Sequence, residues 1–130
     1  MSIKDSQGYS LIELMVAVAI IGIISSIAVP TYTYYIESSE NSVASTQLDT
    51  LILFEEAYRF NNDTFLAGTM VGNDPSSVLY TDVGFKPGSN GENFTYKVEA
   101  CDTDTIAACF KATVSLTDKP TVQVSYSSEP

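Results

Sequence analysis

The stretch that decides the fold is G-Y-S-L-I-E-L-M-V-A-V-A-I-I-G-I-I-S-S-I-A-V-P, residues 8–30. From Leu11 to Val29 it is apolar except for two serines, one glycine and one carboxylate, that of Glu13. As an α-helix this part would span roughly 28 Å, about the thickness of the hydrocarbon core of a bilayer. The segment therefore predicts a helix long enough to cross a membrane.

Glu13 is the residue of this helix that most needs an explanation. Insertion scales put an acidic side chain at the centre of a membrane helix at a cost of roughly 2.5–3.5 kcal/mol, and less toward the helix ends. No Lys, Arg or His occurs between Asp5 and Tyr58, so the chain offers no nearby cation. We therefore expect the partner of Glu13 to be another molecule, or an amine created by cutting the chain.

The overall composition argues against several classes of function. The 130 residues include 6 Lys and Arg against 16 Asp and Glu, a formal net charge of −10, which disfavours binding to nucleic acids or to anionic lipid surfaces. The chain has no His, the commonest general base and transition-metal ligand. It also has no G-x-S-x-G, Walker lysine or H-E-x-x-H motif. We expect neither an enzyme nor a cofactor.

The helix is expected to continue beyond Pro30, because neither Gly nor Pro occurs between Thr31 and Arg59. In this half, residues 31–60, apolar side chains recur every three to four positions, which predicts an amphipathic helix resting on a domain. The residues on that side are Ala44, Leu48, Leu51, Ile52, Glu55 and Tyr58.

After residue 60, the spacing of the apolar residues no longer follows a helical period. Residues 61–93 are rich in Gly, Pro, Asn and Asp, which predicts a long connecting loop with one short strand near Val78–Tyr80. From Phe94 to residue 130, F-T-Y-K-V-E-A-C, C-F-K-A-T-V-S-L and T-V-Q-V-S-Y-S alternate apolar and polar residues. The expected fold class is α+β: a long N-terminal helix packed on an antiparallel sheet of about three to four strands.

The residues from Gly8 to about Tyr35 resemble the N-terminus of type IV pilins and pseudopilins, and Tyr58–Phe65 resembles the helix end of the same superfamily more loosely. The resemblance implies that Gly8 is the recognition residue of a prepilin peptidase. Cleavage would follow Gly8 and leave an N-methylated Tyr9 as the first mature residue. Glu13 would be the carboxylate that directs assembly.

The resemblance also implies an organisation of the chain. Residues 1–8 would be the leader peptide, residues 9–30 the half of the helix that first lies in the membrane and then in the filament core, and residues 31–130 the globular pilin domain. Gly22 and Pro30 would bracket a stretch that can lose helicity in a packed filament, in keeping with the cost of both residues in a helix.

The function implied is that of a structural subunit of a type IV pilus, made in the inner membrane and then assembled into an extracellular filament. The implied partners are further pilin subunits, a prepilin peptidase that also methylates, and an inner-membrane assembly platform. Two alternatives remain open: a pseudopilin of a type II secretion or DNA-uptake system, and a membrane-anchored binding module that does not polymerise.

Cys101 and Cys109 flank the predicted turn between two strands, so they can face each other. In an exported chain an even number of cysteines favours a disulfide over two reduced thiols, and we expect a C-terminal disulfide hairpin. Asp102 and Asp104 lie between them and carry oxygens of the kind that bind Ca²⁺. A solvated hairpin tip accounts for these two residues better, so no metal site is expected.

Overall fold

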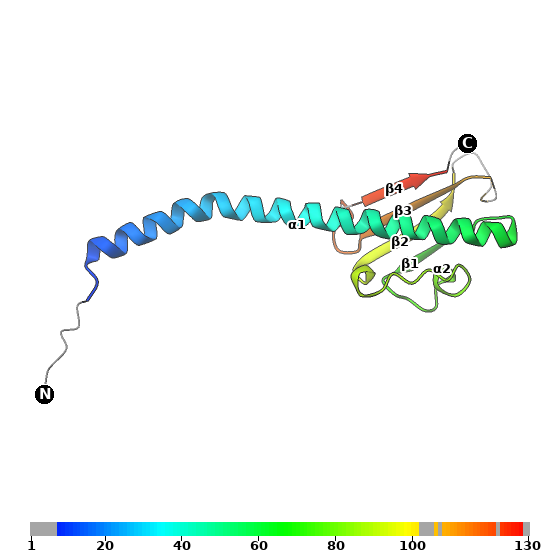
Figure 1. The fold of residues 1–130 in the computed structure, drawn as a ribbon, viewed down its shortest axis with the longest axis horizontal. Coiled ribbons are helices and arrows are strands. Elements are labelled where there is room, and N and C mark those ends of the chain that lie inside the picture. The colour runs from blue at the N-terminus through cyan, green and yellow to red at the C-terminus, as the bar shows by residue number, and fades with distance from the viewer. Residues whose placement is uncertain (1–7, 102–105, 107, 122, 129–130) are drawn as a thin grey trace, which may run out of the picture. The chain divides into compact units, whose positions relative to one another are not determined.

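The structure, a computed structural model, describes residues 8–101, 106, 108–121 and 123–128. Its longest element is α1, Leu11–Asn62, a single helix of 52 residues (Figure 1). Contacts divide the chain into one unit that ends at Ile36 and a second that starts at Glu37. Helix α1 contributes to both units, and each is described here by itself. The predicted continuation of the helix through Pro30 is confirmed.

Local chemistry sets both ends of α1. At its start, Ser10 precedes the first helical residue and caps it, as described below. At its end, Asp63 adopts φ 58°, and its N–H donates to the carbonyl of Arg59 at 2.8 Å. A left-handed residue that bonds back in this way terminates helices, because the chain can no longer continue the helical ladder. The helix therefore ends only a few residues beyond the predicted boundary near Arg59.

The second unit contains a four-stranded antiparallel sheet in the order β1-β2-β3-β4. Strands β2 (Phe94–Ala100), β3 (Phe110–Leu116) and β4 (Gln123–Ser127) form the predicted meander, with Tyr96 opposite Val114 and Ala112 opposite Tyr126. Strand β1 (Gly68–Val71) adds to the free edge of β2. The α+β class and the antiparallel sheet are thus confirmed.

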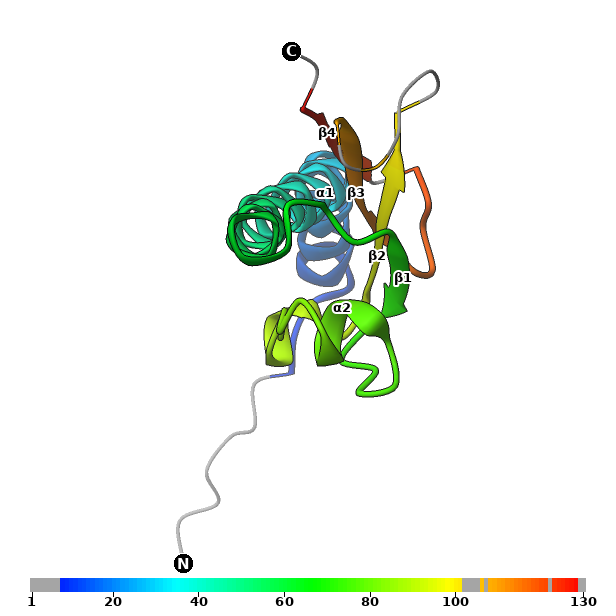
Figure 2. The ribbon, with the colours of Figure 1, turned by 90° about the vertical axis from the view of Figure 1, so that its right-hand side faces the viewer.

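The core lies between the second half of α1 and one face of the sheet, as the view along the helix shows (Figure 2). Helix α1 contributes the buried Ala44, Leu48 and Leu51, which are three of the side chains that the periodicity predicted to face the domain. The sheet contributes alternate residues, among them Tyr96 and Val114, both fully buried. Burying one Leu or Val side chain contributes roughly 1.5–3 kcal/mol, so this interface stabilises the second half of α1.

The connection between α1 and β2 differs from the sequence-based expectation in one respect. The strand predicted near Val78–Tyr80 is wrong: the chain forms a short helix there, α2 (Val78–Thr81), and the extra strand is β1. Ser77 caps α2, because its hydroxyl oxygen accepts from the N–H of Leu79 at 3.3 Å. The connection also holds a 3₁₀ turn, η1, at Ser89–Gly91.

Close packing explains why a glycine opens β1. A Cβ at Gly68 would lie 2.6 Å from Cγ2 of Val78 and 3.2 Å from Cγ of Leu79. Only a residue without a side chain lets α2 lie against the strand this closely. The buried Leu79 thereby becomes part of the core.

Candidate functional site

The N-terminus of α1 is closed by a reciprocal pair of hydrogen bonds. The backbone N–H of Ser10 donates to Oε2 of Glu13 at 2.9 Å, and the backbone N–H of Glu13 donates to the hydroxyl oxygen of Ser10 at 3.3 Å. This is a capping box, in which Ser at the cap and Glu three residues later satisfy two backbone donors that the helix leaves free. A carboxylate in the first turn also interacts favourably with the helix dipole.

The capping box adds a partner for Glu13 that the sequence-based argument did not include. The expected partner is a cation from outside the chain, and the structure supplies a neutral backbone donor three residues away. A cationic partner is still missing within the described residues, where the ion pairs are Lys97–Glu99 and Lys119–Glu40. The spacing S-L-I-E in residues 10–13 could have revealed the cap from the sequence alone.

The surroundings of Glu13 are apolar and open. Ile12, Val16, Ala17 and Ile20 line a shallow groove with it along the helix. Ile12 is 64% exposed, and Val16 and Ile20 are each 51% exposed. The carboxylate therefore lies on an exposed apolar surface, and any partner that covers the groove also covers Glu13.

Neither Gly8 nor Tyr9 has a structural role within the described part of the chain. A Cβ at Gly8 would meet nothing within 4 Å, and Gly8 is not among the glycines with positive φ. Tyr9 is 93% exposed. A small residue that the fold does not require is consistent with recognition by another protein at the bond between these two residues.

Gly22 and Pro30 are equally unexplained by local packing. A Cβ at Gly22 would meet nothing within 4 Å, so alanine would fit and would favour the helix by about 1 kcal/mol. Pro30 has no N–H to donate to the carbonyl of Ser26, which weakens the helix one turn before it. The helix is nevertheless continuous through both residues in this single chain.

The surface of α1 in the first unit is mostly apolar and is uncovered. Side chains on all sides are more than half exposed, among them Leu14, Ile20, Ile21, Ile23, Ile24 and Ile27. By length and composition, the helix is long and apolar enough to cross a membrane. An apolar surface of this extent marks a region that packs against lipid or protein.

The predicted disulfide is present. Cys101, which follows β2, is bonded to Cys109, which precedes β3, with their Cα atoms 5.6 Å apart. Cys109 is fully buried, so the bond ties the hairpin to the core. Asp102 and Asp104 lie outside the described residues, and no cluster of metal-binding side chains occurs within the described ones.

A second carboxylate of α1, Glu55, differs from Glu13 because it is buried. It is fully buried on the domain-facing side of α1, and its Oε2 accepts from the N–H of Leu66 at 3.0 Å. Its Oε1 has no hydrogen-bond partner. Burial raises the pKa of Glu55 from 4.5 to about 7, with the Leu66 N–H partly opposing the rise. The helical periodicity placed this residue correctly but gave no sign of its pKa.

Comparison with known proteins identifies the N-terminal segment. Residues 3–29 match the prokaryotic N-terminal methylation motif. The chain is 34% identical to a type IV major fimbrial protein FimA of Dichelobacter nodosus, in a match that covers 80% of this chain and 70% of FimA. A second FimA of the same species is 32% identical, with 88% and 77% covered.

The type IV major pilin protein PilA of Myxococcus xanthus is 31% identical over 76% of this chain, which spans only 40% of that longer protein. No solved structure gives a significant match.

The fold and the matched segment define a prepilin-like protein, with a small α+β domain carried on a long helix whose first half is apolar. The identity with FimA over more than two thirds of its length makes the relationship specific. The chain belongs to the type IV pilin family, the structural subunits of type IV pili.

Proposed function

We propose that this chain is made as an inner-membrane precursor, is cut after Gly8, and polymerises through the apolar half of α1 into a pilus on the cell surface. The observation that carries the proposal is the uncovered apolar surface of α1, which starts at a capped carboxylate. Lipid covers this surface before assembly, and neighbouring helices cover it afterwards. Contacts that join different faces of identical subunits produce an open filament rather than a closed ring.

The capping box gives Glu13 its part in assembly. It holds the carboxylate 2.9 Å from the N–H of Ser10, one residue from the Tyr9 nitrogen that cleavage converts to an amine. A neighbouring helix staggered by about one turn brings its Glu13 to this amine. In the apolar core of a filament, pairing the two charges offsets the cost of burying each alone, and it fixes the register between neighbours.

The other components follow from this sequence of events. A prepilin peptidase that also methylates would act at Gly8 and Tyr9, and an inner-membrane platform would add subunits to the growing filament. The role of the chain itself is structural rather than catalytic, in keeping with the pilins it is similar to. Those relatives are major pilins, which favours a pilus over a secretion or DNA-uptake filament and over an anchored module that never polymerises.

Two substitutions separate helix capping from charge. Glu13→Gln keeps an oxygen that can accept the Ser10 N–H, since Gln also serves in capping boxes, but it removes the charge. Ser10→Ala removes the hydroxyl half of the cap, at a cost of about 0.5–2 kcal/mol, but keeps the charge. Leaving a buried amine unpaired costs about 3–5 kcal/mol, which corresponds to at least about a hundredfold loss in the association constant.

We therefore expect Glu13→Gln to accumulate cleaved subunits in the membrane with few filaments, whereas Ser10→Ala still assembles. The measurement is the yield of sheared surface filaments relative to total subunit, with Glu13→Ala as the variant that loses both interactions. Filament yield from Glu13→Gln equal to that of the unchanged chain would refute the role given to the charge.

A further inference from the structure

Directly after Pro30, the sequence T-Y-T-Y-Y places three of the chain's eight tyrosines within four residues, at Tyr32, Tyr34 and Tyr35. They lie between the end of the apolar run and Glu37, the first charged residue after Glu13. The three side chains are 69%, 75% and 74% exposed. Large aromatic side chains in this position need an explanation beyond the fold of a single chain.

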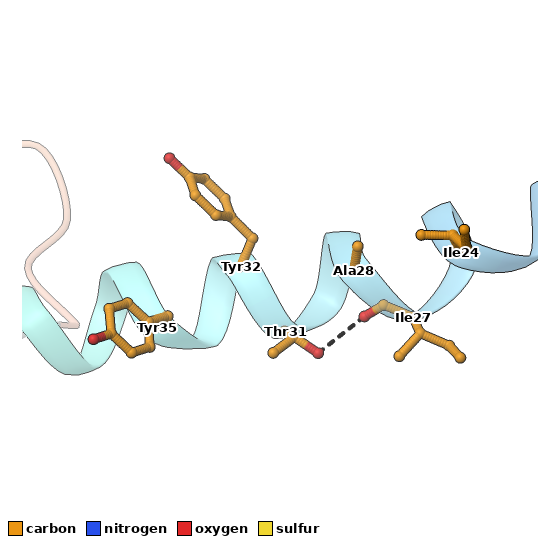
Figure 3. Close-up of a pocket in the computed structure, with 6 residues that line it drawn as sticks. All are labelled: Ile24, Ile27, Ala28, Thr31, Tyr32 and Tyr35. Atoms are coloured by element: carbon orange, nitrogen blue, oxygen red, sulfur yellow. Dashed lines mark hydrogen bonds between the residues drawn. The ribbon is translucent and has the colours of Figure 1, made fainter. Parts of the chain in front are cut away.

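The three tyrosines spread over nearly half of the helix circumference. At 100° per residue, Tyr34 and Tyr35 are turned by about 200° and 300° from Tyr32, so the set covers an arc of about 160°. Figure 3 shows Tyr32 and Tyr35 extending in different directions beside the groove that they line with Ile24, Ile27, Ala28 and Thr31. The stripe Ala44, Leu48 and Leu51, which packs on the sheet, covers an arc of only about 60° by the same count. The wider spread of the tyrosines favours contact with a surrounding medium over packing on one neighbouring element.

The hydroxyl groups of this region differ in whether they find a hydrogen-bond partner within the helix. The hydroxyls of Ser26, Thr31 and Thr33 each donate to a carbonyl of their own helix, at 2.7, 2.9 and 2.9 Å (Figure 3 shows the Thr31 bond). Hydroxyls satisfied in this way are compatible with a lipid environment. Within the described residues, the phenol groups of the three tyrosines have no such partner, and they need polar groups from outside the chain.

The depth of the three tyrosines fits the edge of a bilayer. Ile20 is the midpoint of the apolar run Leu11–Val29, and at 1.5 Å per residue the tyrosines lie about 18–22 Å beyond it. Tyr9 lies about 16 Å from Ile20 in the other direction. The hydrocarbon of a bilayer extends about 15 Å from its midplane and the headgroups to about 20–22 Å.

We propose that Tyr32, Tyr34 and Tyr35 form an aromatic belt in the headgroup layer of the membrane, which sets the depth of the precursor helix, with Tyr9 at the opposite interface. Tyrosine suits this position because its ring is apolar and its hydroxyl bonds to headgroups and water. Basic residues, the other common interfacial anchors, are missing between Asp5 and Tyr58. This inference rests on the membrane-bound precursor of the proposed function.

A depth measurement tests the belt on the full-length precursor in phosphatidylcholine vesicles. The chain has no Trp, so Tyr34→Trp supplies a single fluorescent probe, and Ile20→Trp is the matched control. With lipids brominated at a series of depths, we expect the probe at position 34 to be quenched most about 15–22 Å from the midplane and the control near the midplane. Strongest quenching of the first probe at the midplane, or none at any depth, would overturn the belt.

A labelling experiment tests whether the tyrosines set the depth. Cys101 and Cys109 are bonded to each other, so Ser38→Cys introduces a single reactive thiol for a membrane-impermeant maleimide. Combining it with Tyr32→Leu, Tyr34→Leu and Tyr35→Leu lengthens the apolar run to Ile36, and we expect labelling to slow several-fold as the helix sinks. Tyr126→Leu, on the exposed strand β4, is the control and leaves labelling unchanged. An unchanged rate in the triple variant would contradict the proposal.

Neither measurement depends on cleavage or on filament yield. A belt that fails while the precursor still inserts leaves the pilus assignment intact. A precursor that does not partition into vesicles at all contradicts both the belt and the proposed function.

Discussion

At the scale of single residues, two glutamates of α1 lie in contrasting surroundings. Glu13 is exposed on an apolar surface and bonds to the cap of its own helix. Glu55 is fully buried in the domain core, with one oxygen bonded to the Leu66 N–H and the other without a partner. The first is open to a partner from outside the chain, and the second is costly to ionise where it lies.

The raised pKa of Glu55 makes domain stability depend on pH. In the unfolded chain this carboxyl ionises with a pKa near 4.5, and in the folded domain with a pKa of about 7. Between these values the folded state binds more protons than the unfolded state, so stability falls as pH rises. The contribution is fully present below pH 4.5 and is lost by about pH 7, a change of up to about 3 kcal/mol.

Glu55→Gln should remove this dependence, because the amide has no proton to lose. The measurement is the free energy of unfolding of the detergent-solubilised chain, by urea and circular dichroism, from pH 4 to pH 8. We expect the variant to gain stability relative to the unchanged chain as pH rises, and the exposed neighbour Glu56→Gln to show no such gain. A difference between variant and parent that is the same at pH 4.5 and pH 7.5 would exclude this role for Glu55.

Some properties of these two glutamates can be predicted from the sequence and others cannot. Helical spacing placed Glu55 on the buried side with Leu48 and Leu51, because a period of 3.6 residues carries that information directly. Its pKa depends on burial by side chains distant in sequence, which no local pattern encodes. The capping box of Ser10 and Glu13 is local and was readable, but the expectation of an external partner for Glu13 overlooked it.

At the scale of elements, length decided what could be predicted. Helix α1 and strands β2 to β4 show enough periods for the pattern to identify them. Strand β1 and helix α2 have four residues each, and they depend on the close contact of Gly68 with Val78 and Leu79. The sequence-based prediction consequently places the short strand near Val78–Tyr80, where α2 lies, and not at β1.

The disulfide between β2 and β3 should stabilise the domain measurably. The loop it closes, from Cys101 to Cys109, corresponds to about 2.5 kcal/mol in the chain-entropy model. Replacing both cysteines by alanine, or reducing the bond, should lower the free energy of unfolding by about this amount. Urea unfolding with and without reductant provides the measurement, and equal midpoints under the two conditions would contradict it.

Gly22 tests whether α1 changes conformation on assembly. Gly22→Ala should raise the helicity of the detergent-solubilised subunit, since Ala favours the helix by about 1 kcal/mol. If the stretch between Gly22 and Pro30 loses helicity in the filament, the same substitution should reduce filament yield. Hydrogen exchange of filaments and of free subunits checks the cause directly. Backbone amides from 22 to 30 that are as well protected in filaments as in subunits would rule out the conformational change.

At the scale of the whole molecule, the two units differ in how they bury apolar side chains. In the described residues, the first unit, ending at Ile36, presents an apolar helix without a core of its own, whereas the second encloses a core between helix and sheet. The net charge of −10 discourages adhesion to anionic lipid. Such a division suits a subunit that is stored in a membrane and then packed by its helix into a filament.

The most direct test of this account is the N-terminus of the chain in surface filaments. Filaments sheared from cells and digested for mass spectrometry should yield an N-terminal peptide that begins at an N-methylated Tyr9, with residues 1–8 removed. This result requires both the cut after Gly8 and the retention of the apolar helix in the polymer. A chain that retains Met1, or one that begins after Val29, would contradict the assignment of this helix to the filament core.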